Sequence, residues 1–283
     1  MGTGHETEGS GAGEPRPDGR PHPLRRYGPA AAVGVLAGLL SGLFGVGGGI
    51  LIVPGLVLLM RMPQRLAHGT SLGAIVPIAI SGVVGYAAAD SVDWSAAGFV
   101  TLGAVWGALL GTRVLHVTRH GTLRRIFALF MLLTAVRLLI EVPEALGRDP
   151  ITVGVALALV ALGLLSGTLA GLLGVGGGIV IVPGLILLFS IPAAVAKGTS
   201  LLVIIPTAVA GTVSNLWRSN ADLAVAGTVG LFGVASALAA SQVSVKMDAR
   251  TSSVLFAALL VAVAAQMLLR GDGGRAPGPR GEV

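Results

Sequence analysis

Long apolar runs separated by short polar connections dominate this chain of 283 residues. Runs of this kind are typical of membrane-spanning helices, each of which needs about 20 apolar residues. We count ten hydrophobic segments, five in each half, at residues 28–45, 46–60, 66–88, 95–115, 123–140, 151–173, 175–189, 195–216, 223–243 and 251–269. The pattern predicts an all-α membrane protein.

The second half of the chain repeats the first. Residues 42–82 and 171–211 align without a gap at an offset of 129 positions, and 25 of the 41 aligned residues are identical. Each copy carries a GVGGG run inside an uncharged stretch, at 27–60 and at 150–196. Both stretches are too long for one straight crossing, and glycine weakens a helix interior. We therefore expect each to form a broken helical hairpin at its glycines.

The charges of the loops indicate how the two copies are oriented. Basic residues gather in the N-terminal tail, at 61–65 and at 113–125, which the positive-inside rule places in the cytoplasm. The connection at 190–194, equivalent to 61–65, has no basic residue. Because five segments per half is an odd number, these charges favour two inverted five-segment repeats over a parallel repeat with four segments per half. Both termini are then cytoplasmic.

Composition agrees with a membrane protein, since charged residues make up only 11% of the chain against about 25% in soluble domains. The net charge of +6 comes from basic tails and short loops, so we expect no nucleic-acid partner. With no cysteine and no metal-ligand spacing among its five histidines, the chain is expected to bind no metal or other cofactor. We divide it into a disordered cytoplasmic tail, a first transmembrane repeat, a linker loop, a second transmembrane repeat and a second disordered cytoplasmic tail, at residues 1–26, 27–140, 141–150, 151–270 and 271–283.

The GVGGG motif is the first candidate for chemistry. Neither the Lys-Ser/Thr pair of a Walker loop nor the acidic residue of a dinucleotide fingerprint follows it. In a broken helix at membrane depth, the free N–H groups and positive dipole end of the following half-helix favour an anion. The alternative is a tight helix crossing in which glycine supplies only space. The candidate residues are Gly45, Gly47, Gly48, Gly49, Gly174, Gly176, Gly177 and Gly178.

A second motif follows in each copy, HGTS at His68–Ser71 and KGTS at Lys197–Ser200. We expect each to open a long apolar helix, where one hydroxyl caps the helix and the other can coordinate an oxyanion. His68 and Lys197 are equivalent by the repeat; they either face the anion or snorkel to the membrane interface. The candidate binding residues of this motif are therefore Thr70, Ser71, Thr199, Ser200, His68 and Lys197.

The paired GhGGGhhhVPxL stretches, Gly45–Leu56 and Gly174–Leu185, each followed by GTSL, resemble the TauE/SafE sulfite exporter family. The resemblance covers about residues 28–270. It implies a multi-pass permease of the inner membrane that moves sulfite or organosulfonates. The glycines and the Thr-Ser pairs are the positions that match the family's motif.

We therefore expect a secondary transporter, an exporter of a small sulfur-containing anion, driven by an ion gradient or by the anion's own gradient. The two broken hairpins should meet near the bilayer midplane, and one half should rock against the other. The alternative is a non-transporting membrane scaffold or accessory subunit. We expect no enzymatic activity, because no acid/base or nucleophile–base pair can be recognised. The expected partners are a small anionic solute and the lipid bilayer.

Overall fold

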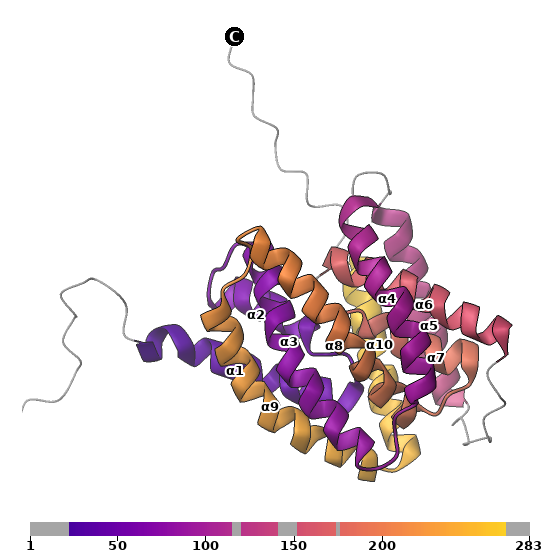
Figure 1. The fold of residues 1–283 in the computed structure, drawn as a ribbon. Helices are drawn as coiled ribbons and strands as arrows, with labels where there is room; N and C mark the ends of the chain where they lie inside the picture. The colour runs from indigo at the N-terminus through magenta and orange to yellow at the C-terminus, as the bar shows by residue number, and fades with distance from the viewer. Residues whose placement is uncertain (1–22, 115–119, 141–151, 174–175, 270–283) are drawn as a thin grey trace, which may run out of the picture.

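The computed structural model describes residues 23–114, 120–140, 152–173 and 176–269, and the regular structure in these ranges is helical (Figure 1). The predicted linker at 141–150, the tail at 271–283 and residues 1–22 lie outside the described residues. The helices are α1 (Pro23–Phe44), α2 (Gly49–Leu59), α3 (Gln64–Ala87), α4 (Trp94–Val114), α5 (His120–Ile140), α6 (Val153–Leu173), α7 (Gly178–Phe189), α8 (Ala193–Trp217), α9 (Leu223–Lys246) and α10 (Ala249–Leu269). The all-α prediction is confirmed, and α1 begins inside the range predicted as a tail.

Helices α2 and α7 are too short to cross a membrane. They have 11 and 12 residues, about half of what a crossing needs. Each runs back beside the long helix before it, because Gly55 of α2 packs on Val33 of α1 and Gly184 of α7 packs on Leu162 of α6. Six of the described helices, α1, α3, α6, α8, α9 and α10, are long and apolar enough to span a membrane.

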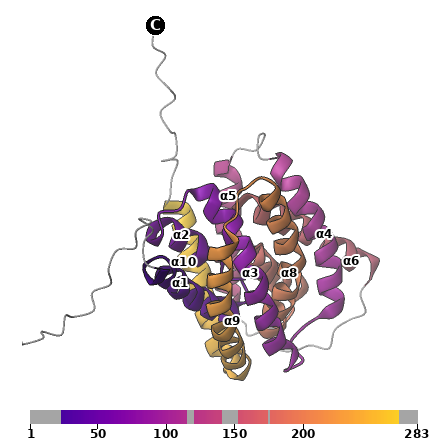
Figure 2. The same cartoon turned by 60° about the vertical axis from the view of Figure 1, so that its left-hand side comes forward.

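The helices form two bundles, and each bundle contains one helix from the other sequence half. Helix α9 packs against α1 and α3, whereas α4 packs against α6 and α8. We call α1, α2, α3 and α9 the α9 bundle, which lies on the left of Figure 1, and α4, α6, α7 and α8 the α4 bundle. In Figure 2, α4 and α6 again lie side by side, away from α1 and α2. Helices α5 and α10 pack against each other. A sequence half is therefore not a packing unit.

The central helices α3 and α8 run in opposite directions. Gly73 near the start of α3 faces Thr212 near the end of α8, and Gly82 near the end of α3 faces Leu201 near the start of α8. These two helices carry the equivalent HGTS and KGTS segments of the two copies, so two equivalent helices lie antiparallel to each other.

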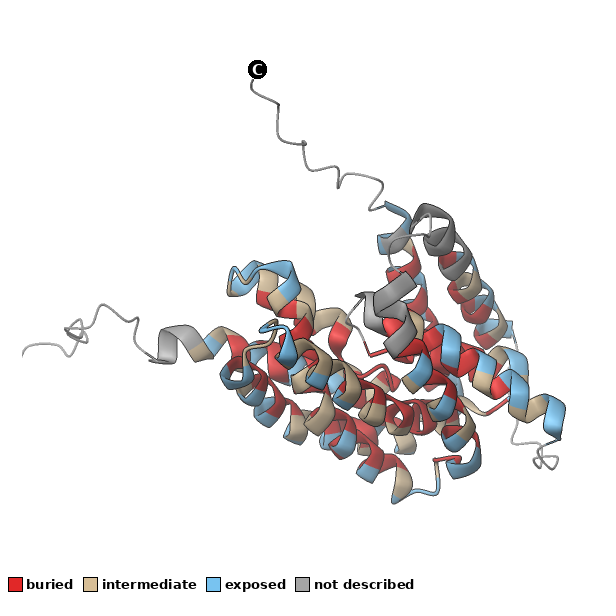
Figure 3. Cartoon of the chain, turned by 45° about the horizontal axis from the view of Figure 1, so that its top comes forward, coloured by how far each residue is buried: buried red, intermediate tan, exposed pale blue. Residues whose placement is uncertain are grey.

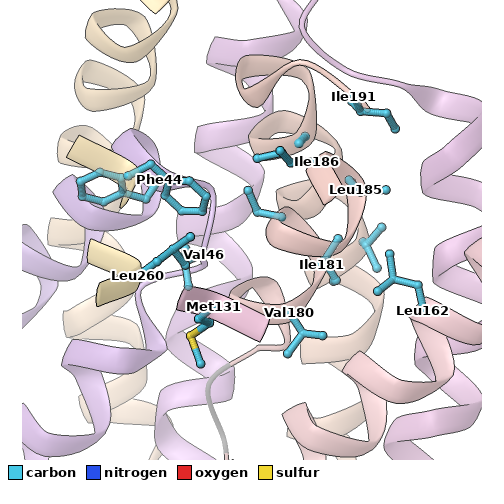
Figure 4. Close-up of a cluster of buried hydrophobic side chains, with 14 of the residues drawn as sticks. Phe44, Val46, Met131, Leu162, Val180, Ile181, Leu185, Ile186, Ile191 and Leu260 are labelled. Atoms are coloured by element: carbon cyan, nitrogen blue, oxygen red, sulfur yellow. The ribbon is translucent and has the colours of Figure 1, made fainter. Parts of the chain in front are cut away.

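Buried residues lie on the inward-facing sides of the helices, and exposed residues lie on the outer surface (Figure 3). One apolar cluster joins α4, α5, α6, α7, α8 and α10 to Phe44, the last residue of α1, and to Val46, two residues further on (Figure 4). A second cluster lies mainly among α1, α2, α3 and α9. The outer surface carries large apolar side chains such as Leu58 and Leu231, which are 72% and 71% exposed. Exposed apolar surface on this scale suits contact with lipid.

Small residues bring helix backbones together at the exchanged helices. On α1, Gly34, Gly38 and Gly42 pack directly on α9. A β-carbon added to Gly42 would lie 2.7 Å from the β-carbon of Ala240 and 2.8 Å from the backbone nitrogen of Ser241. Glycines spaced four apart allow this close approach, as in other membrane helix pairs.

We predict that Gly42→Leu destabilises the protein by about 1–3 kcal/mol or more, because the new side chain overlaps the α9 backbone. Gly98→Leu is the matched control, since nothing lies within 4 Å of a β-carbon added there. Thermal unfolding of the purified variants in detergent measures the difference. Equal melting temperatures for the two variants would contradict this packing.

Candidate functional site

The first glycine break separates α1 from α2. Gly45, Gly47 and Gly48 have φ angles of 70°, 79° and 72°, in the left-handed region that favours glycine. For another residue this backbone costs about 1–2 kcal/mol at each position. The chain therefore stops being a helix after Phe44 and resumes at Gly49, as the motif predicts.

The second break has the same backbone. Gly176 and Gly177 have φ angles of 83° and 75°, and α7 begins at Gly178. Gly174, the remaining candidate in this copy, lies outside the described residues.

The two breaks lie against each other. Added β-carbons on Gly47 and Gly176 would each be in contact with Ile75 and Ile204, which lie near the middle of α3 and α8. A β-carbon on Gly178 would lie 2.8 Å from the Cα atom of Val46. The short helices α2 and α7 consequently start at the same place, between the two central helices.

The helix starts at this place have no side-chain caps. The N-cap residues are Gly48 and Gly177, and neither α2 nor α7 has a side-chain hydrogen bond at its cap. The first N–H groups of any α-helix have no partner within the helix. Both starts are buried, as are residues 45–49 and 176–178. Two positive helix-dipole ends at one buried place favour a negatively charged ligand.

The threonines of the HGTS and KGTS motifs bind the backbone of the opposite copy. Thr199 Oγ1 accepts a hydrogen bond of 2.9 Å from the N–H of Asp93, just before α4. Thr70 Oγ1 accepts one of 2.9 Å from the N–H of Asp222, just before α9. These bonds hold the start of each exchanged helix against the central helix of the other copy.

The two motifs lie inside their helices and do not open them, contrary to the sequence expectation. Helices α3 and α8 begin at Gln64 and Ala193, four residues before His68 and Lys197, and their N-caps are Pro63 and Pro192. Thr70 and Thr199 lie six residues after these starts, too far along the helix to cap it, so their hydroxyls are available to the neighbouring helix.

Sequence reasoning missed two aspartates that belong to these contacts. Asp93 accepts a hydrogen bond of 2.9 Å from the N–H of Ala96, and Asp222 accepts bonds from the N–H groups of Ala224 and Val225. Each therefore caps the helix that the opposite threonine holds. The signal was present, because the two aspartates are separated by the repeat offset of 129 positions.

The motif serines are fully buried, and one of them has an unused hydroxyl. Ser71 and Ser200 are both 0% exposed. Within the described residues, Ser200 Oγ has no hydrogen-bond partner. It lies three residues after Lys197 and four before Ile204, so all three share one face of α8. Since Lys197 and Ile204 both contact the glycine breaks, Ser200 lies on the face that meets them.

A second unused hydroxyl belongs to Ser41, which the sequence did not single out. Ser41 is 0% exposed, and its Oγ has no partner among the residues that the structure describes. It lies on α1 four residues after Ala37, whose backbone contacts Gly48. Its equivalent in the repeat is Ala170, so the comparison of the two copies did not find it.

His68 and Lys197 differ in burial. His68 is half-buried on α3. Lys197 is 1% exposed, and its Nζ donates to Ser252 Oγ at 2.7 Å. In this structure Lys197 therefore points into the protein and does not snorkel to the surface.

Together these features define a multi-pass helical membrane protein with two glycine breaks at its centre. The chain belongs to the sulfite exporter TauE/SafE family, whose sequence model matches residues 9–138 and 159–282. This confirms the family resemblance and the expectation of a membrane transporter family.

Several similar proteins are named probable membrane transporter proteins. YunE of Bacillus subtilis (strain 168) is 26% identical over 267 residues, which is 84% of this chain and 96% of the relative. YdhB of the same strain is 28% identical over 191 residues, 66% of this chain and 78% of the relative. A protein from Xylella fastidiosa (strain 9a5c) is 39% identical over 117 residues, 40% of this chain and 44% of the relative. No solved structure matches the chain.

We predict that Thr199→Val destabilises the protein by about 1–3 kcal/mol, because it leaves the buried N–H of Asp93 without its acceptor. Thr199→Ser keeps the hydroxyl and should unfold close to the parent temperature. Thermal unfolding in detergent compares the three proteins. A serine variant as unstable as the valine variant would show that the hydrogen bond is not the cause.

Proposed function

We propose that the protein is a secondary transporter that carries a small sulfur-containing anion, such as sulfite or an organosulfonate, across the inner membrane. The substrate class follows the family's description, and the binding site follows from the two glycine breaks. The observation that carries the proposal is the convergence of two uncapped helix starts at one buried place.

The anion is held by the N–H groups at the starts of α2 and α7. Backbone N–H groups and helix dipoles bind an oxyanion without a fixed full charge, which suits a site that must also release its ligand. The unused hydroxyls of Ser41 and Ser200 supply two further donors, because a buried polar group without a partner calls for a ligand or a water. Thr70 and Thr199 act indirectly: their hydrogen bonds to the backbone of the other copy hold α3 and α8 in place around the site.

The two copies are inverted repeats that cross the membrane in opposite senses. The antiparallel course of the equivalent helices α3 and α8 supports this arrangement. The exposed Arg61 lies in the turn before α3, and the exposed Arg65 lies in the first turn of α3. The exposed Arg218 lies in the turn after α8, at the same end of this antiparallel pair. Asp90 lies at the other end, after α3. The basic end and both termini are then cytoplasmic by the positive-inside rule.

Alternating access takes place between the α9 bundle and the α4 bundle. The exchanged helices argue against a simple rocking of one sequence half on the other, because α9 is packed into the first half and α4 into the second. The plane between α3 and α8 contains both breaks, so a sliding or tilting of one bundle on the other changes the surroundings of the bound anion. The direction of net transport follows the gradients.

A scaffold without transport activity is the competing function, and ligand binding separates the two. Sulfite, sulfate, thiosulfate and methanesulfonate are each added to the purified protein during thermal unfolding. A transporter is stabilised by at least one of them through mass action. A melting temperature that none of them changes would favour the scaffold.

The transport site is tested by uptake of labelled sulfite into proteoliposomes with Ser41→Ala and Ser200→Ala. Each variant should raise the apparent Michaelis constant about tenfold or more, since a hydrogen bond to a charged ligand contributes about 1.5–3 kcal/mol. Stability should hardly change, because neither hydroxyl has a partner to lose among the described residues.

Thr134→Val is the matched control for these uptake measurements. Thr134 is fully buried on α5, and its hydroxyl donates to the carbonyl of Phe130 in its own helix at 2.9 Å. This variant should transport like the parent. Parent-like Michaelis constants in both serine variants would remove the two hydroxyls from the site.

A further inference from the structure

We propose that Lys197 binds a proton that crosses the membrane together with the anion, so that each cycle carries one proton with one anion. The proposal rests on the proposed function and adds the coupling ion to it. It starts from the one lysine that is buried among the described residues.

The ammonium group of Lys197 is enclosed by neutral groups. Its Nζ lies 2.7 Å from Ser252 Oγ, 3.5 Å from Ser244 Oγ, and 5.8 Å and 5.6 Å from the ring centroids of Phe44 and Phe256. Within the part of the chain that the structure describes, these are the recorded partners of the ammonium. A buried cation with neutral partners is costly unless an anion approaches it or it gives up its proton.

This enclosure, which we call the lysine cage (Phe44, Ser244, Ser252 and Phe256), accepts both forms of the side chain. Hydroxyl oxygens and aromatic faces stabilise the ammonium. The carbonyl end of α1 lies beside the cage, because Ser244 Oγ donates to the carbonyl of Leu43 at 3.0 Å. A serine hydroxyl can also donate to the lone pair of a neutral amine. Lys197 can therefore lose its proton without leaving an unsatisfied group.

The lysine cage is divided between parts that the transport cycle moves. Lys197 belongs to α8 of the α4 bundle, whereas Phe44 and Ser244 belong to α1 and α9 of the α9 bundle. Ser252 and Phe256 belong to α10. Movement between the bundles must separate the ammonium from some of these partners. The proton affinity of Lys197 then differs between the state that takes up the anion and the state that releases it.

Lys197 also packs directly on the first break. A β-carbon added to Gly45 would lie 2.5 Å from the Cα atom and 2.7 Å from the β-carbon of Lys197. A positive charge beside the helix starts strengthens anion binding, and by linkage a bound anion strengthens proton binding at Lys197 by the same factor. Proton and anion therefore bind together and leave together.

Other titratable groups near α8 do not replace Lys197 in this role. Tyr86 of α3 hydrogen-bonds with Ser244 Oγ at 2.9 Å and with the carbonyl of Gly42 at 2.8 Å. Asp93 precedes α4 and caps it. Asp248 precedes α10, is exposed, and accepts from the N–H groups of Arg250 and Thr251. The aspartates thus serve helix starts, and the phenol neighbours the cage without contacting Nζ.

The coupled step conserves protons and charge. The neutral amine of Lys197 takes up one proton on the side where the anion enters, and the ammonium returns it on the side where the anion leaves. A monoanion and a proton together carry no net charge, so the membrane potential does not oppose the step. An inward gradient of one pH unit then drives accumulation of a monoanion up to about tenfold.

Proteoliposomes containing a fluorescent pH indicator test this coupling with sulfite and with methanesulfonate, whose charge is constant over the working pH range. In the parent protein, either anion added outside should acidify the interior, and an inward pH gradient should drive methanesulfonate uptake. Lys197→Arg keeps a positive charge that does not titrate, so its uptake should no longer respond to the gradient. Comparing the two proteins with the same anion cancels any protons that the anion itself carries.

Two further variants complete the test. Lys246→Met, which changes an exposed lysine at the end of α9, should respond to the gradient like the parent. Ser252→Ala leaves Lys197 in place but removes the closest acceptor of its ammonium. The pH of half-maximal uptake should fall by about one unit or more in this variant.

Each outcome bears on a different proposal. If the parent moves neither anion, the proposed function fails, and this inference fails with it. If the parent moves an anion without acidifying the interior, or if Lys197→Arg still responds to the gradient, transport stands and the role of Lys197 is overturned. An unchanged pH of half-maximal uptake in Ser252→Ala would likewise overturn the proposed role of the lysine cage in proton binding.

Discussion

Two glycine-rich backbone segments cross in direct contact at the centre of this protein, and the rest of the structure depends on that crossing. Gly45 packs on the backbone of Lys197, and Gly178 packs on that of Val46. The turns need left-handed φ angles at Gly45, Gly47, Gly48, Gly176 and Gly177, which a β-carbon opposes. Glycine is thus required twice, for the conformation and for the contact. The crossing brings the starts of α2 and α7 together.

The exchanged helices keep this crossing in place. Because α9 packs on α1 and α3, and α4 on α6 and α8, neither copy of the repeat can bury its apolar faces without the other. The hydrogen bonds from Asp93 to Thr199 and from Asp222 to Thr70 fix where each exchanged helix begins. The GTS motif therefore joins the two copies, and in the second copy its Ser200 is left on the face toward the breaks. Motion in such a protein occurs between bundles that each contain helices of both copies.

Much of this architecture could be predicted from the sequence. The helices, the short segments α2 and α7 and the breaks at the glycines follow from hydropathy, from glycine's weakness in helices and from the repeat. The exchange of α4 and α9 could not be predicted, because it depends on which apolar faces meet in space. The sequence prediction placed the starts of α3 and α8 at the HGTS and KGTS motifs, because Thr and Ser are common helix caps. The helices in fact begin at Gln64 and Ala193.

The site itself was only partly predictable. The repeat pointed to the glycines and to the Thr-Ser pairs, because both copies carry them. Ser41 has no counterpart in the second copy, and Lys197 differs from its counterpart His68, so symmetry could not assign them a role. Their burial and their contacts with the breaks became visible only once the helices were packed.

The contact between the two breaks is tested most directly by a disulfide across them, since the chain has no cysteine of its own. Val46→Cys and Ile179→Cys, whose native side chains pack in the same buried cluster, are combined in one protein and oxidised in membranes, with each single variant as a control. A second control combines Leu58→Cys with Leu188→Cys, at the far ends of α2 and α7. Rapid loss of free thiol in the first pair alone is the predicted result. Two persistently free thiols at positions 46 and 179 in a folded protein would contradict the crossing.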